Sequence, residues 1–297
     1  MQVTAAMVKE LRARSGAAMM DCKKALVETD GDIDSAFDHM RKSGAAKAAK
    51  KAGRIAAEGA IVIEAAAGAA VILEVNSETD FVAKDENFSV FARDVAKTIL
   101  AFRPDEPTAL AELKLAHGSD TVESTRQQLV AKVGENISVR RFALVVANGN
   151  HLVEYLHGNR IGVLVELAGG DVALAKDIAM HIAASNPICI SEENVPAELI
   201  AKEKEIQTAQ AEQSGKPPEI AEKMVIGRLR KFVGEITLTG QSFIKDSDKT
   251  VGKLLKEHGA VVKSFIRYEV GAGIEKKEDN FAEEVMAQAR GAESGLS

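Results

Sequence analysis

The stretch Val71–Ile99, VILEVNSETDFVAKDENFSVFARDVAKTI, decides the fold because both of its ends occur a second time in the chain. Its first residues, VILEV, match VLVEL at residues 163–167, and its last residues, FARDVAKTI, match LAKDIAMHI from Leu174. A strand and a following helix that recur in this way indicate an internal duplication.

Each copy also begins with a predicted β-hairpin. Short apolar runs flank a glycine-containing turn, at Ala65–Gly68 in the first copy and His157–Asn159 in the second. Such runs are typical of antiparallel strands. The four runs are residues 61–63, 71–73, 152–154 and 163–165. A helix at 121–134 and a strand at 137–147 are predicted between the copies.

The two copies differ in the length of the segment between strand and helix. Glu74 lies 20 residues before Asp94, whereas Glu166 lies 11 residues before Asp177. The nine extra residues fall in SETDFVAKDENF, residues 77–88. Because loops on a retained scaffold commonly carry function, we predict that this loop does the specialised work.

Residues 1–55 predict three short helices with a small core of their own. Thr4 and Asp32 are suitable N-caps for the first and third helices, and Ile33, Phe37 and Met40 fall on one helical face. The next residues, 45–53 (AAKAAKKAG), have no wide apolar face. We interpret them as a linker or as a helix solvated nearly all round.

The end of the chain predicts more helix. Residues 196–213 and 218–232 form two amphipathic stretches around Ser214–Pro217, which predicts a helical hairpin. A strand is expected at 265–270 and a closing helix at 280–290.

Composition restricts the class of protein. The chain has 297 residues, 46% of them apolar, and a formal net charge of −6, which argues against bulk binding of nucleic acid. Residues 1–53 carry a net charge of +3 and the remainder −9.

The N-terminus has no apolar signal core and no apolar run reaches the length of a spanning helix, so we expect a soluble, cytoplasmic protein. The two cysteines, Cys22 and Cys189, form no CxxC pair, which favours a reduced compartment.

Motifs for common catalytic chemistry are missing from the sequence. It holds no GxxxxGK[ST], no GxGxxG and no HExxH, so no cofactor and no metal site is predicted. Cys22 lies beside Lys23 and Lys24, which could lower the pKa of a thiol, but no histidine is near it in sequence. We therefore predict no catalytic residue.

Two segments resemble the signatures of the bacterial elongation factor Ts family. They are LRARSGAAMMDCKKAL at residues 11–26 and EVNSETDFVAK at residues 74–84, the second of which includes the enlarged loop. The resemblance continues through residues 160–166, 179–187, 213–228 and 265–276, and is weakest at 103–124.

The resemblance implies an α+β fold with four parts. These are a three-helix domain like a ubiquitin-associated (UBA) domain with its linker (1–54), the N-subdomain of a duplicated core with antiparallel strands (55–148), a C-subdomain (149–270), and a C-terminal helical module (271–297). A protruding helical hairpin of coiled-coil type is expected within the C-subdomain at about 188–233. The hairpin would mediate association, either with a second copy or with the partner.

The resemblance further implies guanine-nucleotide exchange on elongation factor Tu during translation elongation, without enzymatic activity, membrane or direct nucleic-acid contact. It places Thr79, Asp80, Phe81 and Val82 against this partner, where Asp80 and Phe81 would disturb its Mg²⁺ site. The alternative from the residues alone is that Asp80 caps a short helix and Phe81 packs into the local core.

Other contacts are implied elsewhere in the chain. Met19 and Met20, with Lys9, Leu11 and Lys23, would dock a helix of the partner; alternatively, both methionines fill the small core. His157 would lie near the partner's phosphate loop or be simply solvated. Phe281 would add a further clamp.

Two rival functions remain at this stage. One is a nucleic-acid or ribosome-associated module that uses the basic stretch 47–54, and its RNA binding would depend steeply on salt. The other is a small-molecule enzyme, which would require turnover by the isolated chain.

Overall fold

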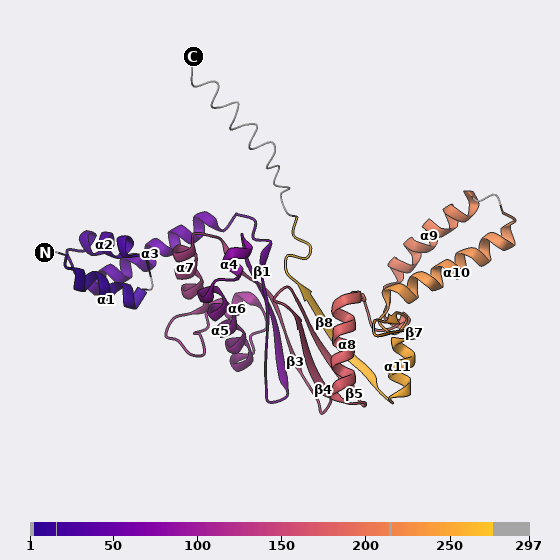
Figure 1. Ribbon diagram of the computed structural model, residues 1–297. Coiled ribbons are helices and arrows are strands. Elements are labelled where there is room, and N and C mark those ends of the chain that lie inside the picture. The colour runs from indigo at the N-terminus through magenta and orange to yellow at the C-terminus, as the bar shows by residue number, and fades with distance from the viewer. Residues whose placement is uncertain (1–2, 16, 214–215, 276–297) are drawn as a thin grey trace, which may run out of the picture.

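The computed structural model describes residues 3–15, 17–213 and 216–275. A three-helix unit, a central body of sheets and helices, and a helical hairpin follow one another across the molecule (Figure 1). The α+β class with antiparallel sheets is confirmed. The predicted closing helix and Phe281 lie outside the described residues.

The N-terminal unit consists of α1 (Ala5–Ser15), α2 (Met19–Glu28) and the first part of α3 (Ile33–Lys51). Thr4 Oγ1 accepts a hydrogen bond from the Met7 amide at 3.3 Å, and Asp32 Oδ1 accepts one from the Ser35 amide at 2.6 Å, so both predicted caps are present. The core of the unit is formed by Val8, Leu11, Cys22, Ala25, Leu26 and Ala36.

Helix α3 continues to Lys51, so of the two alternatives for residues 45–53 the helix is confirmed and the linker is wrong. Most residues of this segment are exposed, but one face is covered. Gly44 and Ala48 are buried. Ala48 belongs to the core of the next unit, and a Cβ placed at Gly44 would lie 3.7 Å from the Ala131 Cβ. Small residues give no wide apolar stripe in the sequence, yet they let α3 pack closely against a neighbouring helix.

The first half of the central body is a sheet covered by helices on one face. Its strands pair in the antiparallel order β1-β2-β3. The elements are β1 (Glu58–Ala66), β2 (Ala69–Ser77), α4 (Asp80–Ala83), α5 (Glu86–Phe102), α6 (Pro107–Ala111), α7 (Val122–Val133) and β3 (Ile137–Val146).

The second half repeats this plan. Its sheet has the order β4-β5-β8, and α11 (Val251–Glu257) precedes β8 as α7 precedes β3. The pairing register shifts after Glu74 in the first sheet and after Glu166 in the second, so even the β-bulge recurs. The remaining elements of this half are β4 (His151–His157), β5 (Ile161–Ala168), α8 (Val172–Ser185) and β8 (Val261–Glu269).

The two sheets pack face to face, with helices on their outer faces. Ile61 and Ile72 of the first sheet share a buried cluster with Leu164 of the second. A Cβ at Gly162 would lie 2.5 Å from Ile61 Cγ2, so a side chain there would force the sheets apart. On the other face of β2, Val71 and Leu73 pack into the core with α5. Strand β2 is consequently buried along its whole length.

A helical hairpin is inserted between α8 and α11 and extends from the central body (Figure 1). His181 of α8 lies beneath its base: the His181 Nε2 atom is 3.0 Å from Gln241 Oε1, and the Ile244 amide donates to Nδ1. The inserted elements are η1 (Glu192–Asn194), α9 (Ala197–Gln213), α10 (Pro218–Ile236), β6 (Ser242–Phe243) and β7 (Asp246–Thr250). The small β6–β7 sheet and α11 were not predicted from the sequence.

Candidate protein-contact site

The enlarged loop of the first half contains the short helix α4 and presents one aromatic ring to solvent. Thr79 Oγ1 accepts a hydrogen bond from the Val82 amide at 3.4 Å and caps α4. Val82 packs partly against the core and Ala83 is buried, whereas Phe81 is 83% exposed. The alternative that Asp80 caps the helix while Phe81 packs into the core is therefore wrong.

Asp80 lies beside the exposed ring and keeps its negative charge. Lys84 Nζ donates to Asp80 Oδ2 at 2.7 Å. This hydrogen bond, aided by the lysine charge and nearby amides, lowers the pKa of Asp80 below its ordinary value. An exposed carboxylate and an exposed ring thus stand next to each other at the end of the most buried strand.

Two residues from the turn between α7 and β3 hold the loop in place. Glu135 accepts hydrogen bonds from the Thr79 amide at 3.0 Å and from Thr79 Oγ1 at 2.7 Å. In return, the Asn136 amide donates to Glu78 Oε1 at 2.6 Å. Both residues were missed from the sequence because they lie more than 50 positions from the residues that they contact, Thr79 and Glu78. The only local signal was an acid–amide pair before a strand.

The predicted surface on the three-helix unit is only partly as expected. Met20 is 72% exposed, and Met19, Lys9 and Lys23 are also exposed, so the alternative that the methionines fill the core is wrong. Leu11, however, is fully buried at the centre of the unit and cannot belong to an exposed docking face. Its place on the inner stripe of α1, with Val8, explains this burial. Val27 adds an exposed apolar side chain that was not predicted.

The predicted residue of the second half, His157, is exposed at the end of β4. Its hairpin tip rests on the first sheet: the Ile61 amide donates to the Asn159 carbonyl at 2.8 Å, and Arg160 pairs with Glu58 at 2.7 Å. Glu58 in turn pairs in register with Ser77, the last residue of β2. The hairpin tip and the enlarged loop are therefore both attached to the same end of the paired strands β1 and β2, where β1 begins and β2 ends.

The predicted surface on the three-helix unit lies apart from the enlarged loop. Helices α1 and α2 lie at one end of the molecule, whereas α4 lies toward its middle (Figure 1). Any single partner would have to span the distance between them.

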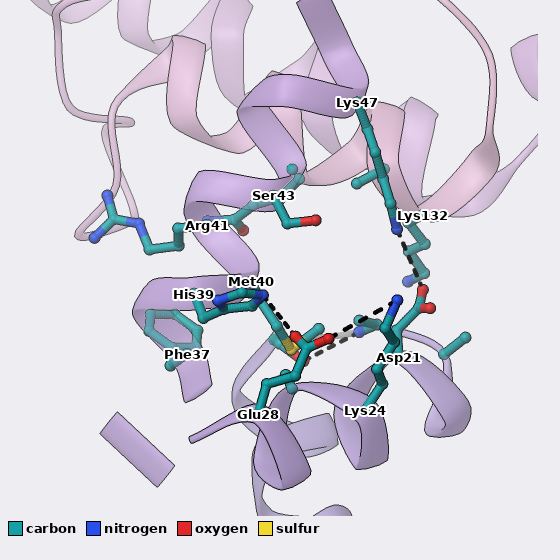
Figure 2. Close-up of a pocket in the computed structure, with 17 residues that line it drawn as sticks. Asp21, Lys24, Glu28, Phe37, His39, Met40, Arg41, Ser43, Lys47 and Lys132 are labelled. Carbon is teal, nitrogen blue, oxygen red and sulfur yellow. Dashed lines mark hydrogen bonds and ion pairs between the residues drawn. The ribbon is translucent and has the colours of Figure 1, made fainter. Parts of the chain in front are cut away.

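A separate cavity of about 280 Å³ lies between the three-helix unit and α7. Polar side chains bridge its walls: Lys47 Nζ lies 3.7 Å from Asp21 Oδ2, and His39 Nε2 lies 2.8 Å from Glu28 Oε2 (Figure 2). None of the predicted contact residues lines this cavity.

In the part of the chain that the structure describes, no group of three or more His, Cys, Asp or Glu side chains is placed to hold a metal ion. Cys22 and Cys189 are free thiols, and Cys22 is buried. Burial raises the pKa of the Cys189 thiol. Among the helices of the described ranges, none has the length and hydropathy needed to cross a bilayer.

The basic stretch 47–54 makes contacts within the chain. Lys51 Nζ donates to the Gly134 carbonyl, and Arg54 pairs with Glu78 at 3.4 Å. Lys47 is paired with Asp21 as described above. These contacts give no support to the rival interpretation of the stretch as a nucleic-acid site.

Fold and site together define a class of α+β protein in which two similar halves pack sheet to sheet and a strand-to-helix loop presents an aromatic ring. Comparison with known sequences narrows this class. The profile of the family described as Elongation factor TS matches residues 78–272. The chain belongs to the elongation factor Ts family.

Similar proteins match over nearly the whole chain. The elongation factor Ts of Thioalkalivibrio sulfidiphilus is 62% identical over 295 residues, which cover 98% of this chain and 100% of the relative. Those of Alkalilimnicola ehrlichii and Methylococcus capsulatus are 58% and 59% identical, over 98% of this chain in each case and over 100% and 99% of the relative. These relatives carry the name of translation elongation factors, which supports a role in translation elongation.

Proposed function

We propose that this chain promotes release of GDP from elongation factor Tu. It does so by binding the nucleotide-free GTPase more tightly than the GDP-bound form. By thermodynamic linkage, such a protein must weaken nucleotide binding by the same factor that nucleotide weakens its own binding. The chain itself catalyses no covalent chemistry in this scheme.

The predicted point of action is the Asp80–Phe81 pair. A translational GTPase holds its nucleotide through phosphate contacts and a bound Mg²⁺, so a wedge near this site is sufficient to loosen the nucleotide. Phe81 supplies an apolar ring that gains from burial in a partner pocket, and Asp80 supplies a charge that perturbs groups around the ion.

The observation that carries this proposal is the exposed ring on a loop that is already held in place. A large apolar side chain that is 83% exposed adds little to the core of its own chain. Because Glu135 and Asn136 fix the backbone beneath it, little conformational entropy is lost when the ring enters a pocket.

We assign supporting roles to the other exposed residues. Met19 and Met20, flanked by Lys9 and Lys23, form an adaptable apolar surface for a helix of the GTPase. His157 would approach the phosphate-binding side of the same partner. The α9–α10 hairpin would mediate further association.

Release of a fluorescent GDP analogue from elongation factor Tu tests the proposal. The intact chain should accelerate release, and Phe81→Ala should reduce the acceleration at least about tenfold, as expected for a central interface residue. Phe102→Ala is the matched control because Phe102 is 55% exposed in the same half but lies at the far end of α5. Equal release rates with wild-type and Phe81→Ala chains would refute the proposal.

A further inference from the structure

The support of the Phe81 loop comes from outside the loop itself. Helix α4 spans only four residues, Asp80–Ala83, and a single turn is unstable without external contacts. The strongest contacts to its N-terminus come from the turn between α7 and β3, more than 50 residues further along the chain.

The two segments hold each other reciprocally. The Glu135 carboxylate accepts from the Thr79 amide and hydroxyl, and the Glu78 carboxylate accepts from the Asn136 amide. Each segment therefore gives a backbone N–H to a glutamate of the other. Hydrogen bonds to carboxylates are shorter and stronger than neutral ones, and Asn136 is buried.

The same turn also holds the end of α3. Asn136 Nδ2 donates to the Arg54 carbonyl at 2.8 Å, and Arg54 pairs with Glu78. The loop is thus fixed with respect to both the central body and the helix that carries the three-helix unit.

We infer that Glu135 is a positioning residue for exchange, acting through Phe81 without touching the partner. The inference rests on the proposed function. With the carboxylate in place, Thr79 begins α4 at a fixed point, and Phe81 projects outward two residues later. Without it, the Thr79 amide and hydroxyl lose their acceptor, and the turn that carries the ring is free to move.

A double-mutant cycle in the GDP-release assay tests the inference. Glu135→Ala should lower the stimulated rate roughly tenfold, a loss of the size expected for misplacing an interface anchor. In a Phe81→Ala background the same change should lower it by less than about twofold, because no ring remains to be positioned. Amide hydrogen exchange at residues 79–84 should be faster in Glu135→Ala, while exchange in α8 is unchanged.

Two further variants serve as a conservative replacement and as a control. Glu135→Gln keeps the shape of the side chain and serves if Glu135→Ala fails to fold. Glu112→Ala removes an exposed carboxylate elsewhere in the same half and should leave the release rate unchanged.

The outcomes separate the two hypotheses. If Phe81→Ala impairs release but both Glu135 variants match wild type, the positioning role is wrong and the proposed function stands. Equal losses from Glu135→Ala in both backgrounds would likewise overturn the positioning role. If Phe81→Ala itself has no effect on GDP release, the proposed function is wrong, and the positioning role that rests on it is wrong as well.

Discussion

Replacing Glu74 of β2 by Gln should destabilise the protein more than the same change at Glu166, the corresponding carboxylate of β5. Glu74 is wholly buried between the two sheets. Its carboxylate lies 3.0 Å from Arg140 and 2.6 Å from Arg141, and it accepts the Gly271 amide at 2.8 Å. Because the bulge inserts Arg140, two consecutive arginines of β3 reach one acid, although neighbours in a regular strand point to opposite faces.

The loss of stability can be estimated from the two arginines that Glu74→Gln leaves without a charged partner. Breaking a buried ion pair by removing one partner costs about 3–5 kcal/mol. The side chains of Arg140 and Arg141 retain 25% and 35% exposure, so water partly compensates them, and the amide of Gln can still accept from Gly271. We therefore expect a loss of about 2–3 kcal/mol in the free energy of unfolding.

Urea unfolding followed by far-ultraviolet circular dichroism measures the effect, since the chain has no tryptophan to report by fluorescence. Glu166→Gln is the matched control. Glu166 occupies the same position in the second half but accepts from neutral groups, Asn150 at 2.7 Å and Ser264 at 3.3 Å, so its loss should cost less than about 1 kcal/mol. Equal destabilisation by the two substitutions would refute the reasoning.

The difference in stability between wild type and Glu74→Gln should also depend on pH. Burial alone would raise the pKa of Glu74, but hydrogen bonds from Gly271, Asn76 and the two arginines outweigh it and hold the pKa below its ordinary value. A carboxyl group whose pKa is lowered by folding stabilises the protein above the ordinary pKa of about 4.3. The advantage of wild type over Glu74→Gln should therefore shrink as the pH falls below about 4.

Three other predictions concern single side chains. Met20→Ala should weaken affinity for elongation factor Tu about tenfold in a titration, with an unchanged urea midpoint, because Met20 is 72% exposed; unfolding of the unit would contradict this. Leu11→Ala should destabilise the three-helix unit by about 2–4 kcal/mol, seen as loss of helical signal at lower urea, and a silent substitution would contradict its full burial. Burial lowers the pKa of His181, so stability should fall as the pH drops below about 6.5, and His181→Gln should flatten this part of the pH profile.

Elements with a strong local pattern could be predicted from the sequence. The strand pairs around Gly68 and Gly158, and the helices that follow them, were found where alternation and turn residues placed them. The unequal lengths of the two copies located the enlarged loop, but the residues alone left open whether Phe81 is exposed or packed into the core, and only the resemblance favoured exposure.

Features that depend on distant contacts could not be predicted. Glu135 matters for the loop only because the α7–β3 turn folds beside it, and no local pattern encodes that neighbour. The same holds for Ala48, which looked solvated until α7 covered it. Leu11 is different, because it shares the inner face of α1 with Val8 at helical spacing, and only the resemblance placed it on a docking surface.

The burial of β2 has a mechanical consequence for the loop that follows it. This strand has a partner strand on each edge, helices on one face and the second sheet on the other. A load applied at Phe81 reaches Ser77 within four residues, and Ser77 ends a strand that is buried along its whole length. Force on the ring is therefore passed to a strand that is held on both edges and on both faces.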